Sequence, residues 1–178
     1  MKTRIKIHMI GSAHIDPVWL WDKEAGIIEV LSTCRSADQL IKENDKFIFT
    51  LSDVWVYEMI EKYDKKLFQS IKKHVMNGSW DIPGGMYVQP DCNLISEESI
   101  KKHLQFTKDY FFEKFNITVN CGFNVDSFGH SAAFPKIFND MDFNHYVMMR
   151  PSYSEMPFKS NLFRWYGNNK KSSLLTWR

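Results

Sequence analysis

A histidine and an aspartate stand two residues apart near the start of the chain, in Ala13-His14-Ile15-Asp16-Pro17. In an extended segment, residues two apart point to the same side of the backbone, so His14 and Asp16 are expected to face one pocket. An imidazole nitrogen and a carboxylate oxygen supply half of the ligands of a typical divalent metal site. The same pair also suits a hydrogen bond that orders its loop, and both interpretations stand at this point.

A second candidate, Asp126, ends an apolar segment in Cys121-Gly122-Phe123-Asn124-Val125-Asp126-Ser127-Phe128-Gly129-His130-Ser131. A carboxylate delivered there by a strand could ligate a metal ion, act as a general base or attack a substrate carbon. It could equally cap a helix or form an Asx turn, for which aspartate is favoured. His130 could be a ligand, but a histidine at the start of a helix is more often a hydrogen-bonding turn residue.

Two further side chains have types that could bind a ligand. Arg150 precedes Pro151, which favours extended backbone before it, and its guanidinium suits a site carboxylate, a substrate oxygen or a surface ion pair. The indole of Trp19 could stack on a sugar ring or be buried in a core.

The hydrophobic pattern alternates between segments typical of strands and segments typical of helices. This alternation predicts an α/β fold with a mainly parallel sheet, open or closed into a barrel, followed by a hairpin-like strand pair. The expected strands cover residues 4–10, 47–51, 79–82, 117–125, 143–149, 161–166 and 173–177. The expected helices cover residues 23–43, 54–77, 97–115 and 131–140, with Ser52-Asp53 as the N-cap of the second.

The polar candidates fall after successive strands of this expected order. His14 and Asp16 follow the first strand, and Gln89 and Asp91 lie in the loop after the third. Asp126 ends the fourth strand and Arg150 ends the fifth. Because ligands of parallel α/β folds bind beyond the carboxyl ends of the strands, these side chains are expected to meet on one face.

Composition bounds the class of protein. The 178 residues are 44% hydrophobic and 25% charged, which is ordinary for a folded globular domain. A net charge of +2 gives no basic field for nucleic acid, and no apolar stretch approaches the roughly 20 residues of a membrane span. Three cysteines at unrelated spacings, and an N-terminal apolar run interrupted by Lys6 and His8, favour a cytoplasmic protein with reduced thiols.

These motifs together resemble glycoside hydrolase family 38, the retaining α-mannosidases. Residues 11–21, with their His-Ile-Asp-Pro-Val-Trp, resemble the first motif of the family, and residues 84–94, Gly-Gly-Met-Tyr-Val-Gln-Pro-Asp-Cys-Asn-Leu, its second signature loop. Residues 124–131 resemble the nucleophile motif, and residues 162–167 and 173–178 resemble a later strand pair. The likeness covers essentially the whole chain and is greatest to bacterial members.

The resemblance implies roles for matching residues. His14 and Asp16 match two zinc ligands, and Asp126 matches the residue that is both zinc ligand and catalytic nucleophile. The implied cofactor is one Zn²⁺ per site. The implied chemistry is the hydrolysis of terminal α-mannosidic bonds with retention, which needs a second carboxyl group as acid and base.

Substrate contacts are implied as well. Trp19 matches an aromatic residue that stacks on the bound mannose, Phe128 lines the same subsite, and Arg150 lies beside the nucleophile. Asp91, in the second signature loop, is expected to contact substrate too. The expected partner is a mannose-containing oligosaccharide or glycoside.

The resemblance also sets an expectation for the domain. Residues 1–178 match the N-terminal portion of a catalytic domain that is a distorted seven-stranded β/α barrel, so we expect a partial barrel with an additional strand pair. The fourth zinc ligand of the family, a histidine, and its acid/base aspartate lie downstream. We therefore expect a truncated chain, inactive and poorly stable alone, and a full-length mannosidase that could form homo-oligomers.

Two other functions fit the same residues. A metal-dependent polysaccharide deacetylase also places Asp and His ligands at strand ends, but it uses metal-bound water and forms no covalent sugar intermediate. A truncated gene product could instead bind carbohydrate without catalysis. Trapping a fluorosugar on Asp126 would favour the glycosidase, and acetate release would favour the deacetylase.

Overall fold

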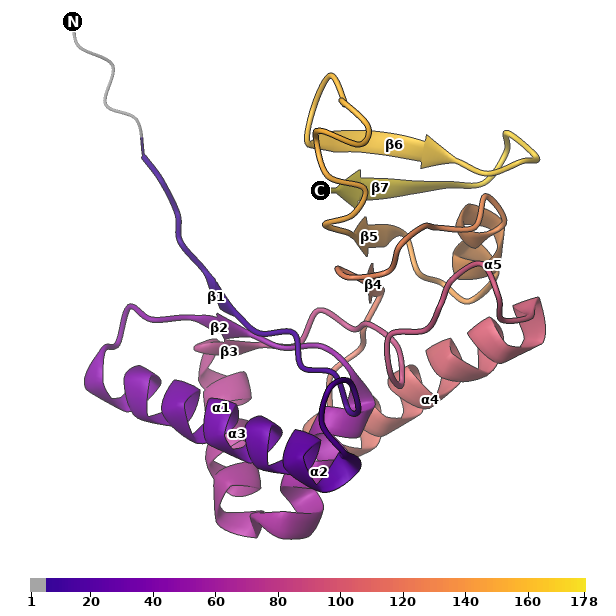
Figure 1. The fold of residues 1–178 in the computed structure, drawn as a ribbon. Coiled ribbons are helices and arrows are strands. Elements are labelled where there is room, and N and C mark those ends of the chain that lie inside the picture. The colour runs from indigo at the N-terminus through magenta and orange to yellow at the C-terminus, as the bar shows by residue number, and fades with distance from the viewer. Residues whose placement is uncertain (1–5) are drawn as a thin grey trace, which may run out of the picture.

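The computed structural model describes residues 6–178, and its first half is a small parallel sheet covered by helices (Figure 1). The sheet has the order β1-β2-β3, with all neighbours parallel. Three helices pack beside it, on the same side in the view of Figure 1. The strands are β1 (Gly11–Ser12), β2 (Phe49–Thr50) and β3 (Trp80–Asp81), and the helices are α1 (Lys23–Glu43), α2 (Val54–Tyr63) and α3 (Lys65–Asn77).

The second half forms a four-stranded sheet of order β4-β5-β7-β6. Strands β4, β5 and β7 are parallel, and β6 pairs with β7 in antiparallel register from Leu162–Trp177 to Tyr166–Ser173. The elements are α4 (Glu97–Phe115), β4 (Cys121–Phe123), α5 (Phe134–Asp140), β5 (His145–Val147), β6 (Leu162–Tyr166) and β7 (Ser173–Trp177).

A single backbone junction joins the two sheets. Gly84, just beyond β3, forms an isolated parallel bridge with Cys121 of β4, and Gly85 N donates to Cys121 O at 2.9 Å. Within residues 6–178 the strands therefore lie side by side in the spatial order β1-β2-β3-β4-β5-β7-β6, and β1 and β6 are the two free edges. The expectation of a seven-stranded barrel is not confirmed, because these strands form two joined parallel sheets and not a closed barrel.

The helix ends follow from local sequence. Asp22 caps α1 by accepting from Ala25 N at 2.9 Å, and Ser96 caps α4 by accepting from Ser99 N at 3.2 Å. Gly78 ends α3 in a left-handed conformation, φ 80°, which glycine adopts without steric cost.

The expected helices at 23–43 and 97–115 and the strand at 173–177 are confirmed. The single helix expected over 54–77 is wrong, because the chain breaks at Asp64, which ends α2 and caps α3 through Leu67 N. The helix expected over 131–140 begins only at Phe134. Most strands are shorter than expected, and of the first expected strand residues 4–5 lie outside the described residues while 6–10 carry no ladder. Among the described residues no helix is both long and apolar enough to cross a membrane.

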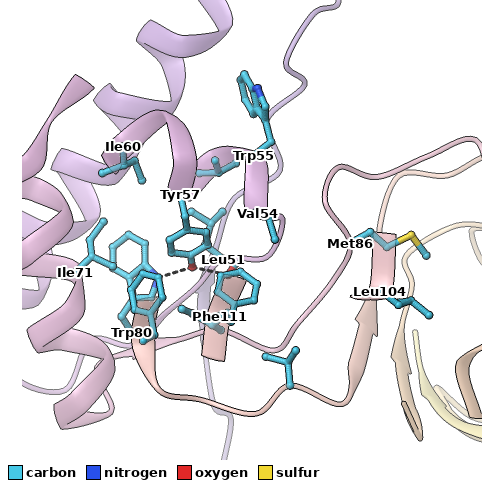
Figure 2. Close-up of a cluster of buried hydrophobic side chains, with 14 of the residues drawn as sticks. Leu51, Val54, Trp55, Tyr57, Ile60, Ile71, Trp80, Met86, Leu104 and Phe111 are labelled. Atoms are coloured by element: carbon cyan, nitrogen blue, oxygen red, sulfur yellow. Dashed lines mark hydrogen bonds between the residues drawn. The ribbon is translucent and has the colours of Figure 1, made fainter. Parts of the chain in front are cut away.

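An aromatic cluster forms the centre of the first half (Figure 2). Tyr57 of α2 and Trp80 of β3 are fully enclosed, at 0% and 1% exposure. Trp80 Nε1 donates to Tyr57 Oη at 2.9 Å, and Tyr57 Oη donates to Leu51 O at 2.7 Å. Phe111 of α4 meets the Tyr57 ring edge to face, with centroids 5.2 Å apart. The hydroxyl thus satisfies two buried polar groups at the point where α2, α4 and the sheet meet.

Removing the Tyr57 hydroxyl tests how much it contributes to the stability of the fold. We expect Tyr57→Phe to lower the free energy of unfolding by about 1–3 kcal/mol, because it leaves Trp80 Nε1 and Leu51 O buried without partners. Chemical denaturation followed by circular dichroism measures this change. Tyr153→Phe removes a hydroxyl from a residue that is 67% exposed and should change stability by less than about 0.5 kcal/mol. Equal effects of the two substitutions would contradict this account.

Candidate functional site

The loops that follow the first four strands enclose a cavity of about 310 Å³. Each loop leaves the carboxyl end of its strand, the edge at which parallel α/β folds place their ligands. Because β1 to β4 are neighbours, four loops far apart in sequence meet there. The polar and aromatic residues lining the cavity are His14, Asp16, Trp19, Asp53, Gln89, Asp91, Asp126, Ser127 and Phe128.

His14 and Asp16 face the same side, as their spacing predicts. His14 Nε2 lies 3.0 Å from Asp16 Oδ1. The loop is fixed from behind, because Trp21 Nε1 donates to Asp16 O at 3.1 Å. Gly26 lets α1 approach the loop closely, since a β-carbon there would lie 2.3 Å from Pro17 O. Helix α1 therefore holds the His14 segment in place.

Asp126 lies between an arginine and the histidine. Arg150 Nε donates to Asp126 Oδ1 at 2.7 Å, and His14 Nε2 is 3.8 Å from Asp126 Oδ2. The Arg150 main chain is held in turn by His130, whose Nε2 lies 2.9 Å from Arg150 O and whose Nδ1 lies 2.9 Å from Tyr146 Oη. Burial lowers the pKa of His130, in keeping with a neutral ring that donates to the carbonyl. The expected turn role of His130 agrees with these contacts.

Gln89 is the polar residue with the most connections in the cavity. Its Oε1 accepts from Val125 N at 3.0 Å and from Asp126 N at 3.3 Å. Its Nε2 lies 3.1 Å from His14 Nδ1 and 3.2 Å from Asp53 Oδ2. One carboxamide therefore links the loops after β1, β2 and β4.

Asp53 carries a carboxyl group whose Oδ1 is buried without a hydrogen-bond partner. Burial raises the pKa of Asp53 to about 6, against the lowering effect of the hydrogen bond from Gln89. Its backbone φ of 70° is unusual for a residue other than glycine, and its side chain makes no cap hydrogen bond to α2. Asp53 does occupy the expected N-cap position of α2, but its side chain lines the cavity and does not cap the helix.

Beneath the cavity, a buried polar cluster joins the loop after β3 to the loop after β4. Asn124 Nδ2 lies 2.6 Å from Cys92 Sγ, and Ser127 Oγ lies 2.7 Å from Asn124 Oδ1 and 2.9 Å from Pro90 O. Asn124 has no exposed surface. Since Asp126 stands between Asn124 and Ser127, this cluster fixes the backbone that carries it.

Two aromatic rings stand exposed at the rim. Trp19 is 63% exposed and Phe128 is 85% exposed. The Trp19 ring meets Trp21 edge to face, with centroids 5.3 Å apart, and the Arg150 guanidinium lies over the Phe128 ring at 4.8 Å. Asp91 is also exposed, with Oδ1 accepting from Asn93 N at 3.1 Å. The rim therefore offers flat apolar faces beside polar oxygens, a combination that suits a ring with hydroxyl groups.

The donor types at this site fit a divalent metal such as zinc, which takes imidazole nitrogen and carboxylate oxygen. His14 and Asp16 are in contact, but the third donor, Asp126 Oδ2, is more distant, while Arg150 holds the other oxygen of that carboxylate. Within residues 6–178, no three His, Cys, Asp or Glu side chains are arranged as a set that could hold a metal ion. The described chain thus presents a half-site with a neighbouring carboxylate.

The structure brings together all of the site residues expected from sequence. His14, Asp16, Trp19, Asp91, Asp126 and Phe128 line the cavity, and Arg150 contacts two of them. Asp53 was missed as a site residue, although its position directly after a strand was the signal used for His14 and Asp126. A helix N-cap offered a sufficient explanation for an aspartate before a helix.

Comparison with known proteins gives a family match over almost the whole chain. Residues 4–178 match the model of the glycosyl hydrolases family 38 N-terminal domain. The chain is 25% identical over 174 residues to alpha-mannosidase G of Dictyostelium discoideum and 26% identical over 162 residues to human alpha-mannosidase 2C1. These alignments cover 97% and 90% of this chain, but the chain spans only 16% of each relative.

Solved structures share the fold. An α-mannosidase from Enterococcus faecalis V583 superposes with a TM-score of 0.83 at 19% identity, covering 94% of this chain and 19% of that one. A proposed polysaccharide deacetylase from Mycobacterium smegmatis superposes with a TM-score of 0.61 at 10% identity, covering 86% of this chain and 48% of that one. At such identities the likeness concerns the fold alone. Both solved structures, one named an α-mannosidase and one a proposed polysaccharide deacetylase, share that fold.

Asp53 gives the site a pH-dependent effect on stability. Because its pKa is raised in the folded protein, the folded state binds its proton more tightly, so stability falls as pH rises from about 4 to above 6. The difference between an ordinary aspartate pKa of about 4 and a pKa of about 6 corresponds to roughly 3 kcal/mol of folding free energy. We expect Asp53→Asn to be more stable than wild type at pH 7.5, with the difference vanishing near pH 4. Urea titrations of both proteins from pH 4 to 8 measure this difference, and a gap that does not depend on pH would contradict it.

Proposed function

The chain belongs to glycosyl hydrolase family 38, and from that premise we propose that it supplies the nucleophile and the metal half-site for retaining hydrolysis of terminal α-mannosidic bonds. The observation that carries the proposal is the meeting of Asp126, His14 and Asp16 in one cavity beneath exposed aromatic rings. Curated relatives that cover the chain are named α-mannosidases, which supports a mannoside as substrate.

Asp126 is placed to act as the nucleophile. Arg150 Nε donates to Oδ1 and fixes the orientation of the carboxyl group, while Oδ2 lies on the side of His14. In the proposed step, an oxygen of Asp126 bonds to the anomeric carbon as the glycosidic C–O bond breaks, and the leaving oxygen takes a proton from the acid/base residue. By the family resemblance that residue lies downstream of residue 178. It then removes a proton from water, which releases the sugar with its configuration retained.

His14 and Asp16, with Asp126 as the neighbouring carboxylate, would contribute part of a zinc site. When bound, the metal would orient and polarise the cis 2- and 3-hydroxyls of a mannose ring. An epimer whose 2-hydroxyl points elsewhere could not offer both oxygens, which gives a physical reason for a preference for mannose. The donor set of the described residues provides part of such a site, and the fourth ligand is a downstream histidine by resemblance.

Trp19, Phe128 and Asp91 complete the proposed sugar subsite. The exposed faces of Trp19 and Phe128 can pack against the apolar side of a pyranose ring, and Asp91 can accept hydrogen bonds from its hydroxyls. Arg150 reaches both Asp126 and the Phe128 ring, so it also fixes the Phe128 wall. The fold would also suit a deacetylase, but the family match favours the glycosidase.

Substitution of the nucleophile tests this function. In a polypeptide that continues past Arg178 through the rest of the catalytic domain, we expect Asp126→Asn to lower kcat for an aryl α-mannoside by on the order of 10⁴-fold, because an amide cannot form the glycosyl ester. Asp45→Asn, at an exposed turn, is the matched control and should leave activity unchanged. Release of acetate from acetylated polysaccharide, without mannoside cleavage, would move the function to the deacetylase.

The 178-residue chain alone gives a second test. We expect no measurable turnover of an aryl α-mannoside, because the acid/base residue inferred from the family is outside this segment. Steady-state release of the aryl group, with zinc present, is the measurement. Substantial turnover would show that a described carboxyl group takes the acid/base role.

A further inference from the structure

The orientation of the Gln89 carboxamide is fixed by groups whose roles are unambiguous. Val125 N–H and Asp126 N–H can only donate, so the atom that faces them at 3.0 and 3.3 Å must be the Gln89 oxygen. The NH₂ group of Gln89 consequently faces the opposite way, toward Asp53 and His14. Exchanging the two ends of the amide would set donors against both backbone amides.

This orientation decides where His14 carries its proton. Gln89 Nε2 has two hydrogens and no acceptor capacity, with Asp53 Oδ2 at 3.2 Å and His14 Nδ1 at 3.1 Å. His14 Nδ1 must therefore accept a hydrogen bond and carry no proton. A neutral ring then has its proton on Nε2, the nitrogen that lies 3.0 Å from Asp16 Oδ1 and 3.8 Å from Asp126 Oδ2.

Metal-binding histidines have the opposite arrangement. The ligating nitrogen is unprotonated, and the other ring N–H donates to a carboxylate, carbonyl or water, which fixes the tautomer and strengthens the ligand. In this chain the nitrogen facing the two aspartates is Nε2, and the group behind Nδ1 is a donor.

We propose that Gln89 is a positioning residue that fixes His14 in the tautomer protonated on Nε2, and so weakens metal binding through that nitrogen. The proposal rests on the proposed function for its metal site, but its tautomer assignment rests only on the hydrogen bonds of Gln89. Binding at Nε2 requires the proton to move to Nδ1, where it meets the Gln89 NH₂ group. Residue 89 is thus a determinant of metal affinity, although it is not a ligand.

The Asp53–Gln89 pair allows an exchange that isolates this effect. In Asp53→Asn/Gln89→Glu the amide and the acid trade places, so the net charge and the number of donors are kept. One oxygen of the carboxylate introduced at position 89 would accept from Val125 N–H and Asp126 N–H. Its other oxygen would accept from His14 Nδ1–H and from the amide introduced at position 53. The single variant Asp53→Asn keeps Gln89 and is the matched control.

Two readouts test the proposal on the 178-residue chain. Long-range ¹H–¹⁵N NMR of protein labelled at histidine reports which ring nitrogen of His14 is protonated, with His14→Gln identifying its signals. Competition with a chelator, using Zn²⁺ alone, gives the affinity. We expect wild type and Asp53→Asn both to carry the proton on Nε2, and Asp53→Asn to bind zinc no more tightly than wild type, because it removes a negative charge near His14. The double variant should carry it on Nδ1 and bind zinc at least about tenfold more tightly.

Each outcome is informative. If NMR of the wild-type protein shows the His14 proton on Nδ1, the assignment of the Nε2-protonated tautomer is wrong, and no variant is needed to show it. An unchanged tautomer or an unchanged zinc affinity in a folded double variant, its fold checked by the backbone NMR spectrum, overturns the proposed role of Gln89. A tautomer exchange with no zinc bound by any protein supports the assignment and refutes the metal site of the proposed function instead.

Discussion

The close approach of two backbones at Gly84 and Cys121 holds the site together. A β-carbon at Gly84 would lie 2.3 Å from Cys121 O, and the φ of Gly84 is 130°, so only glycine fits there without strain. This contact joins the β1-β2-β3 sheet to the β4 sheet and sets the loop after β3 beside the loop after β4. Gln89 can therefore reach the amide of Asp126.

Each functional side chain is held by a different element. His14 depends on the packing of α1 against its loop at Gly26, and Asp126 on the buried cluster of Asn124 and Ser127. Arg150 depends on His130, which lies in the turn after β4 and contacts the Arg150 carbonyl oxygen. This arrangement is typical of sites in parallel α/β folds, in which the sheet is the rigid scaffold and the loops after successive strands carry the functional side chains.

Much of this arrangement could be predicted from sequence, and the reasons are local. The period-two spacing of His14 and Asp16 and the strand before Asp126 predicted their shared face, and the hydrophobic pattern predicted the helices at 23–43 and 97–115 closely. Periodicity could not predict whether the strands close into a barrel, because closure depends on strand partners that periodicity does not specify. The role of Asp53 was hidden because an aspartate before a helix also predicts a helix cap. The role of Gln89 depends on hydrogen-bond directions, which only the three-dimensional structure gives.

The most direct test of the account is covalent trapping on Asp126. An α-mannosyl fluoride with fluorine also at C5 has a leaving group that needs no acid, so it can label the nucleophile even without the downstream acid/base residue. The zinc-loaded chain would be treated, digested and mapped by mass spectrometry. We predict one added fluoromannosyl group, located on Asp126. A label on another residue, or none at a concentration that labels a known retaining α-mannosidase, would contradict the assignment of Asp126 as the nucleophile.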